Sequence, residues 1–384
     1  MKRWMLGLGL VVLLGGNSIQ AYAMEEDREE ALTESVSEDD TIEEYLEQLD
    51  FDEVDSMLAE KGTGITFEGL VQSIIDGDKG ELLKKFLTVI FEEVLAFRYD
   101  LLQMILLCVV FSILYNFTNI FENPAVTEIS FYMVYMLLLV LLLKSFFVLK
   151  DVVLVVLEDM LVFLKLLVPT FSLSMVFSGQ MTIGTAFYEL TFFVIYAIEW
   201  LMNNLVVPAI QIYVIVEMMN YLTEEEMLSK LTELIKEGIE WLLKLVFTMV
   251  VGINVVQNLL TPVIDSFKSN LISRTAGMIP GLGTSINAVT EIMVGSGIVI
   301  KNGVGVAAIL ILLVLCAGPV VKVWVMTFLY RMVAAVMQPI ADKRMLGCIS
   351  GAGEGGRLLG RVTVTTVVMF LVTIAMVTAA TTFR

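Results

Sequence analysis

Six charged residues lie inside stretches that are otherwise apolar, and they are the first candidates for chemistry: Glu158, Asp159, Lys165, Glu189, Glu199 and Lys322. A charge inside a bilayer costs about 2.5–3.5 kcal/mol on insertion scales, so such side chains usually face a bundle interior or water. One interpretation is a conduit or substrate path lined by these groups. The alternative is structural: Lys165 pairs with a carboxylate on a neighbouring helix, or the charges reach the interface at helix ends.

A second set of residues could break or pack helices. Gly318-Pro319 precedes Lys322, and proline there can kink a helix and free a backbone carbonyl. Gly303 stands four residues before Ala307, a spacing that lets membrane helices approach closely. The other candidates for helix breaks and close packing lie within one apolar stretch: Pro280, Gly281 and Gly283.

Three glycines, Gly351, Gly353 and Gly356, satisfy the pattern GxGxxG. A dinucleotide site needs that turn between a strand and a helix of a βαβ unit. Here a charged segment precedes the pattern and an apolar stretch follows it. We therefore expect a flexible cytoplasmic loop rather than a nucleotide site.

The residue types exclude several kinds of chemistry. The chain has no histidine, which excludes a histidine-based triad and a haem or zinc site that uses histidine. It has no GxxxxGK[ST] pattern, so no ATPase of its own is expected. Cys108, Cys316 and Cys348 are too far apart in sequence for a CxxC pair. We interpret Cys108 and Cys316, which lie in apolar stretches, as small core residues, and expect no catalytic residue, metal or cofactor.

The elements that hold these residues follow from composition. Of 384 residues, 57% are hydrophobic and 17% are charged, whereas soluble domains carry about 25% charged residues. The mean hydropathy is +0.83, and the apolar residues come in long blocks, which indicates a lipid bilayer as solvent. The sequence predicts an all-α fold, a polytopic transmembrane helical bundle of about 7–8 spans.

Eight apolar blocks are candidate spans, at residues 101–120, 129–149, 152–176, 183–216, 242–263, 276–300, 304–330 and 362–383. The block 276–300 contains Pro280 and several glycines, so a broken or re-entrant helix is an alternative there. A full crossing is favoured because it places the basic loop 331–361 inside and the acidic segment 217–241 outside, as the positive-inside rule requires.

Three regions follow from this pattern. Residues 1–23 combine Lys2 and Arg3, an apolar stretch and Ala21-Tyr22-Ala23, which is typical of a cleaved signal peptide, with an uncleaved anchor as the alternative. Residues 24–98 form an acidic extracytoplasmic N-terminal region, and residues 99–384 form the multi-span transmembrane domain. The cell membrane is thus the expected location.

The N-terminal region carries the whole charge imbalance, because residues 25–100 hold 24 acidic and 6 basic residues and the chain has a net charge of −18. Such a segment is a poor ligand for nucleic acid, and no nucleic-acid partner is expected. From Thr41 its pattern is helical, with Thr66 as the cap of a helix that carries Phe67, Leu70 and Val71. This small helical region is expected on the membrane face or on a partner.

The segment 223–241 differs from the apolar blocks. Thr223 and Glu226 form a capping-box pattern, and an apolar stripe follows with charges opposite: Leu228, Leu231, Leu234, Ile235 and Ile239. The pattern predicts an amphipathic helix that lies along the membrane or on a partner. A solvated helical hairpin is the alternative.

An ordered series of motifs marks the C-terminal half: Arg274-Thr275-Ala276, Ile279-Pro280-Gly281-Leu282-Gly283, Lys301-Asn302-Gly303-Val304-Gly305, Gly318-Pro319 and Ala334-Ala335-Val336-Met337-Gln338-Pro339. Upstream, Asn123-Pro124-Ala125-Val126 and Tyr132-Met133-Val134-Tyr135-Met136 belong to the same series. This series resembles the stage III sporulation protein AE family of endospore-forming bacteria, over most of the chain.

The resemblance implies a non-enzymatic component of the mother-cell membrane that faces the forespore. With other stage III sporulation membrane proteins it would form a channel joining the two cells, needed for late forespore gene expression. A homo-oligomer is also expected. A self-contained secondary transporter stays the alternative, which an inverted repeat around Pro280 would favour. An intramembrane enzyme is disfavoured because no nucleophile or paired-carboxylate motif is found.

Overall fold

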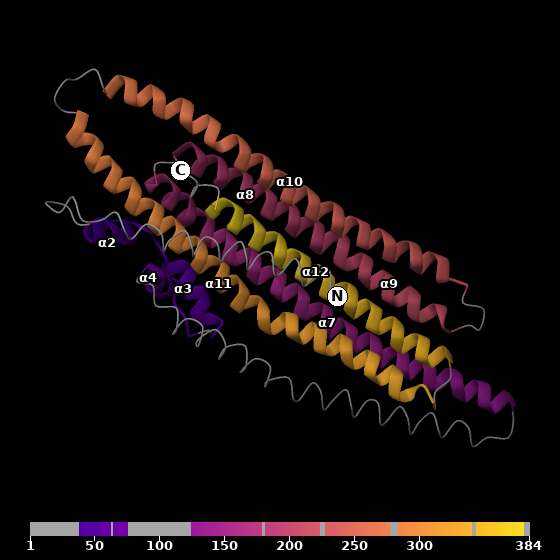
Figure 1. Cartoon of the computed structure of the whole chain (residues 1–384). Helices are drawn as coiled ribbons and strands as arrows, with labels where there is room; N and C mark the ends of the chain where they lie inside the picture. The colour runs from indigo at the N-terminus through magenta and orange to yellow at the C-terminus, as the bar shows by residue number, and fades with distance from the viewer. Residues whose placement is uncertain are drawn as a thin grey trace.

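The computed structural model describes residues 38–62, 64–75, 124–178, 181–222, 227–276, 283–339 and 343–379. All regular elements in these ranges are helical, as predicted for an all-α fold. Figure 1 shows long helices side by side, with three short N-terminal helices against one end of the bundle. The long rods are α7 (Pro124–Phe177), α8–η2–α9 (Met181–Asn220), α10 (Ser229–Ala276), α11 (Gly283–Met337) and α12 (Lys343–Ala379).

Within the described ranges, four helical stretches are long and apolar enough to cross a bilayer: 190–220, 229–256, 293–337 and 343–378. The chain is therefore a helical membrane protein. The count of about 7–8 spans is not confirmed and stays a prediction. The signal peptide, the block 101–120, Cys108 and the break at Pro280 and Gly281 lie outside the described residues.

The lengths of α7 and α11 differ from expectation. They have 54 and 55 residues, which at 1.5 Å per residue gives each about 80 Å, against about 30 Å of hydrocarbon. The turns expected between blocks 129–149 and 152–176, and between 276–300 and 304–330, are wrong. Lys150 and Asp151 remain helical and pair at 2.9 Å, because a charged pair alone does not break a helix that contains no glycine or proline there.

The helices alternate in direction. Gly347 of α12 packs on Tyr221, just past the end of α9, while Gly355 packs on Val214 of α9, so these two helices are antiparallel. The segments 217–241 and 331–361 therefore meet at one end of the bundle, and the prediction that they lie on opposite sides is wrong. The reason is that α11 runs the length of the bundle once, where two crossings were expected.

A short π-helix, η2 (Met202–Val206), joins α8 (Met181–Leu201) to α9 (Val207–Asn220). Pro208 is the second residue after it, and a proline cannot donate to the carbonyl four residues earlier. Widening one turn to the π geometry lets the helix pass this point without a break. The block expected at 183–216 is thus one rod with a local bulge.

The segment 223–241 is not a separate amphipathic helix, because α10 begins at Ser229 and continues to Ala276. Ile239 is buried against the bundle, whereas Leu234 is exposed. The amide of Leu228 donates to Asn220 Oδ1 at 2.6 Å and fixes the start of α10 next to the end of α9. The predicted cap residues Thr223 and Glu226 lie outside the described residues.

The N-terminal helices are α2 (Glu38–Gln48), α3 (Asp52–Glu60) and α4 (Phe67–Ile75). The amide of Gly69 donates to Thr66 Oγ1 at 3.3 Å, which confirms the predicted cap. These helices pack on the chain's own long helices, because Tyr45 stacks on Phe177 at 4.4 Å and Thr170 Oγ1 donates to the carbonyl of Asp50 at 3.0 Å.

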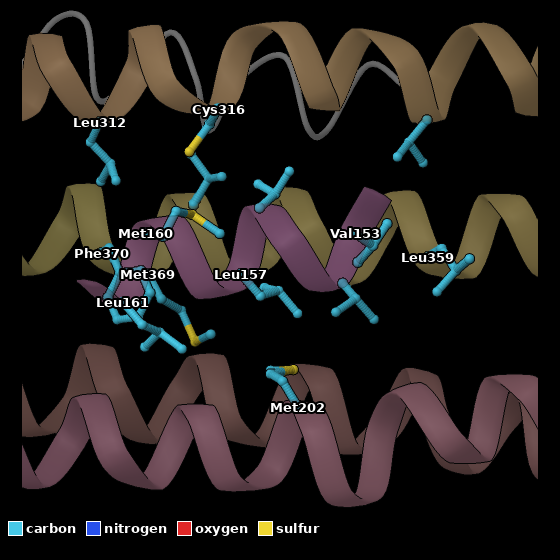
Figure 2. Close-up of a cluster of buried hydrophobic side chains, with 14 of the residues drawn as sticks. Val153, Leu157, Met160, Leu161, Met202, Leu312, Cys316, Leu359, Met369 and Phe370 are labelled. Atoms are coloured by element: carbon cyan, nitrogen blue, oxygen red, sulfur yellow. The ribbon is translucent and has the colours of Figure 1, made fainter. Parts of the chain in front are cut away.

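One apolar core runs through the bundle. Figure 2 shows Met160 of α7 beside Cys316 of α11, and Leu161 of α7 beside Phe370 of α12. Cys316 is buried, as predicted for a small core residue, and Cys348 is buried as well. The core is built where α7, α11 and α12 meet, and it fixes the faces on which their charged residues lie.

Candidate functional site: a charged cluster between three helices

Six charged residues from α10, α11 and α12 form ion pairs on neighbouring turns, and we call them the Glu354 cluster: Lys236, Glu240, Arg331, Glu354, Arg357 and Arg361. Lys236 Nζ lies 3.2 Å from a Glu354 oxygen, and Arg331 lies 3.7 Å from the other. Arg357 also pairs with Glu354. Three cations from three helices thus share one carboxylate.

Spacing on α12 explains why the cluster forms. Glu354, Arg357 and Arg361 are separated by three and four residues, so they lie on one face of the helix. Arg361 pairs with Glu240 of α10, one turn beyond Lys236. Each of these side chains is about one-third exposed or less, whereas Arg331 is half exposed. The cluster is therefore largely enclosed, with Arg331 at its rim.

The positive charges of the cluster outnumber the negative ones. Four cations face Glu240 and Glu354, and Glu217 of α9 lies close by, since a Cβ at Gly351 would come within 2.9 Å of its Cγ. Counting Glu217 still leaves one positive charge in excess. In addition, the Nε atom of Arg357 is buried and has no hydrogen-bond partner in the described ranges.

The glycine-rich stretch of α12 allows this close approach. Gly351, Gly353 and Gly356 lie inside the helix Lys343–Ala379, so the prediction of a flexible loop is wrong. A Cβ at Gly356 would meet Thr327 Oγ1 of α11 at 2.7 Å, and a Cβ at Gly355 would meet Phe146 of α7 at 3.0 Å. These glycines thus remove side-chain bulk where neighbouring helices close on α12, as small residues do in membrane bundles.

The spacing of the α12 residues of the cluster was visible in the sequence, but these residues were not predicted as a site. Glu354, Arg357 and Arg361 have helical spacing, yet the glycines around them favoured a loop. Lys301 was missed for a similar reason, because it was placed in a turn between two spans. In the structure it lies inside α11, has no exposed surface, and its Nζ has no hydrogen-bond partner among the described residues.

Of the predicted charged residues, the structure brings two together. Lys165 Nζ of α7 lies 2.9 Å from Glu199 Oε2 of α8, and 4.7 Å from the centre of the Tyr196 ring. Lys165 therefore has the carboxylate partner that the structural alternative requires. Asp159 pairs with Lys61 of the N-terminal region at 2.7 Å. Neither contact tests a conduit role, which stays a prediction.

The remaining predicted charges are not part of one site in the described structure. Glu158 is exposed on α7 and Lys322 is half-buried on α11. Arg331 follows Lys322 by nine residues, or about 13 Å along the helix. The side chain of Glu189 lies outside the described residues. Their role in a conduit also stays a prediction.

The predicted break and packing residues have separate positions. Gly318 and Pro319 lie inside α11, which continues through them. Gly303 faces α4, and a Cβ there would lie 3.3 Å from Ile75 Cγ1. Gly283 is the first residue of α11. Gly303 therefore belongs to the contact with the N-terminal helices, and Gly318 and Pro319 do not end a helix.

The fold and the cluster define a class of protein: a helical membrane protein whose candidate spans enclose paired charges. The family model for stage III sporulation protein AE matches residues 65–381. The chain belongs to this family of sporulation proteins. It is 27% identical over 366 residues to stage III sporulation protein AE of Bacillus subtilis (strain 168), covering 91% of this chain and 90% of that one. No solved structure matches the chain significantly.

Proposed function

We propose that this chain is a non-enzymatic component of the sporulation channel complex between mother cell and forespore, and that its bundle forms or lines a conduit. It acts in the mother-cell membrane that faces the forespore and is needed for late forespore gene expression. Its partners are other stage III sporulation membrane proteins and further copies of itself. Membership of a sporulation family and the candidate spans support this proposal.

The Glu354 cluster is the observation that carries the proposal. Its members belong to the candidate spans 229–256, 293–337 and 343–378. Charged side chains in such segments usually face a bundle interior, a solute path or a water-filled cavity. Here three helices contribute to one group of charges, so a change in their packing would join or separate these charges.

The test compares two glutamate substitutions on the same fold. Glu354→Gln removes the carboxylate shared by three cations, whereas Glu233→Gln changes an exposed residue that pairs with the exposed Lys230. In sporulating cells, a late forespore reporter and the membrane level of each variant are measured. We expect Glu354→Gln to lose reporter expression at an unchanged protein level, and Glu233→Gln to keep it.

Normal reporter expression in a Glu354→Gln strain would show that the conduit does not depend on the cluster. Co-purification of the chain from sporulating cells supplies the second measurement. Recovery with other stage III sporulation proteins supports the channel complex, whereas recovery of the chain alone in every membrane extract contradicts it.

A self-contained secondary transporter is the second candidate function. A self-contained transporter needs its charged residues within one chain, and the Glu354 cluster lies within one chain. The purified chain in liposomes distinguishes the two, because only a self-contained transporter moves solute without the other sporulation proteins.

A further inference from the structure

The Glu354 cluster has the composition of an anion site. Among the described residues, Lys236, Arg331, Arg357 and Arg361 outnumber by one the carboxylates Glu240, Glu354 and the nearby Glu217. Buried charges are stable only when they are paired and hydrogen-bonded. A ligand that adds negative charge here would therefore stabilise the folded bundle.

The unpaired Nε–H donor of Arg357 indicates which chemical groups the ligand would carry. Its Nε–H is buried and has no acceptor within the part of the chain that the structure describes, while its other end pairs with Glu354. A guanidinium presents its donors as a planar fork that matches the oxygens of phosphate or carboxylate. Arg331 and Lys236, on two other helices, approach the same carboxylate and can contribute further donors.

Two tryptophans place the cluster at a particular depth. Trp324 of α11 packs beside Gly360, and Trp241 of α10 follows Glu240, the partner of Arg361. Both tryptophans therefore lie at the level of Gly360 and Arg361 on α12, and they are 43% and 65% exposed. Exposed tryptophans gather at the membrane–water interface, where lipid phosphates also lie.

We propose that the Glu354 cluster binds a phosphate group, and that the headgroup of an anionic lipid supplies it. Arg331 at the rim, half exposed, makes the first contact, and Arg357 and Lys236 lie behind it. Basic pockets between membrane helices are known to hold lipid headgroups in this way. The inference rests on the proposed function only where it concerns the sporulating cell. Lipid binding itself is a property of the isolated chain.

The test uses the full-length chain in nanodiscs of phosphatidylcholine, with and without phosphatidylglycerol. Thermal unfolding is followed by tryptophan fluorescence for the wild type, for Arg357→Gln and for Lys230→Gln. Lys230 is 91% exposed on α10, outside the cluster, so Lys230→Gln loses one surface charge and serves as the control. A third arm adds inorganic phosphate to the phosphatidylcholine discs, with sodium chloride at equal ionic strength to account for screening.

We expect phosphatidylglycerol to raise the unfolding temperature of the wild type and of Lys230→Gln. Arg357→Gln should need about tenfold more of this lipid for the same effect, because it loses charge-assisted hydrogen bonds. Stabilisation by phosphate alone would assign the site to a soluble phosphate compound and overturn the lipid source. No stabilisation by either, or an equal response of Arg357→Gln, would overturn the site.

If Arg357→Gln fails to fold, Arg331→Gln replaces it, because a half-exposed rim residue is less critical for packing. These measurements do not involve sporulation. If the chain binds the lipid phosphate but the forespore reporter test contradicts the conduit, this inference stands and the proposed function does not.

Discussion

The close contact between α7 and α11 is possible because Gly297 carries a hydrogen atom in place of a side chain. A Cβ there would meet the carbonyl group of Phe177 and, at 2.6 Å, the nitrogen of Ser178. Both are backbone groups, which cannot move aside as the end of a long side chain can. On the same helix, Gly295 has no atom within 4 Å of an added Cβ, so Gly295→Ala is a matched control for Gly297→Ala.

The two substitutions should have opposite effects on the free energy of unfolding. Alanine favours a helix over glycine by about 1 kcal/mol at either position. Overpacking costs about 1–3 kcal/mol, and contact with backbone places Gly297→Ala near the upper value. We therefore expect Gly297→Ala to lose about 2 kcal/mol and Gly295→Ala to gain about 1 kcal/mol.

The predicted gap of about 3 kcal/mol corresponds to roughly a hundredfold difference in the unfolding equilibrium. Unfolding of the purified full-length variants in mixed micelles, followed by tryptophan fluorescence, measures it. If Gly297→Ala proves as stable as Gly295→Ala, the packing of α7 against α11 described above is incorrect.

The remaining predictions concern ion pairs and topology. Lys165→Met should destabilise the chain by about 1 kcal/mol, and the charge swap Lys165→Glu with Glu199→Lys should restore most of the loss in thermal unfolding. Met227→Cys and Gln338→Cys, in a background without native cysteines, should react with an impermeant maleimide from the same side of the membrane, and labelling from opposite sides would contradict the alternating helices. Lys322→Met should abolish forespore reporter expression if Lys322 lines the conduit, and normal expression at a normal protein level would exclude it.

Composition was sufficient to predict the class of fold. Long apolar runs such as 129–149 cannot be solvated by water, and the capping pattern at Thr66 is local, so both were visible in the sequence. The lengths of the helices were not visible. Charged residues such as Lys150 and Lys301 were interpreted as turns, although the helices α7 and α11 continue through them.

The spacing of the three α12 residues of the Glu354 cluster was visible, but the full cluster could not be predicted. Its members are up to 125 residues apart in sequence, as Lys236 and Arg361 are, and only the three-dimensional packing brings them together. Glycines that usually indicate a loop instead lie inside α12. Gly355, for example, is helical because Val214 and Phe146 fill the space that its missing side chain leaves. Such tertiary packing overrides local propensity.

Between Phe131 and Asp159, α7 has neither proline nor glycine, a distance of about 42 Å along its axis. At one end the guanidinium of Arg344 lies 3.8 Å from the centre of the Phe131 ring, and at the other Asp159 holds Lys61. Without proline or glycine, this part of α7 has no hinge at which a force along its axis would bend it. Any shift of the N-terminal helices along α7 would therefore be delivered to the start of α12.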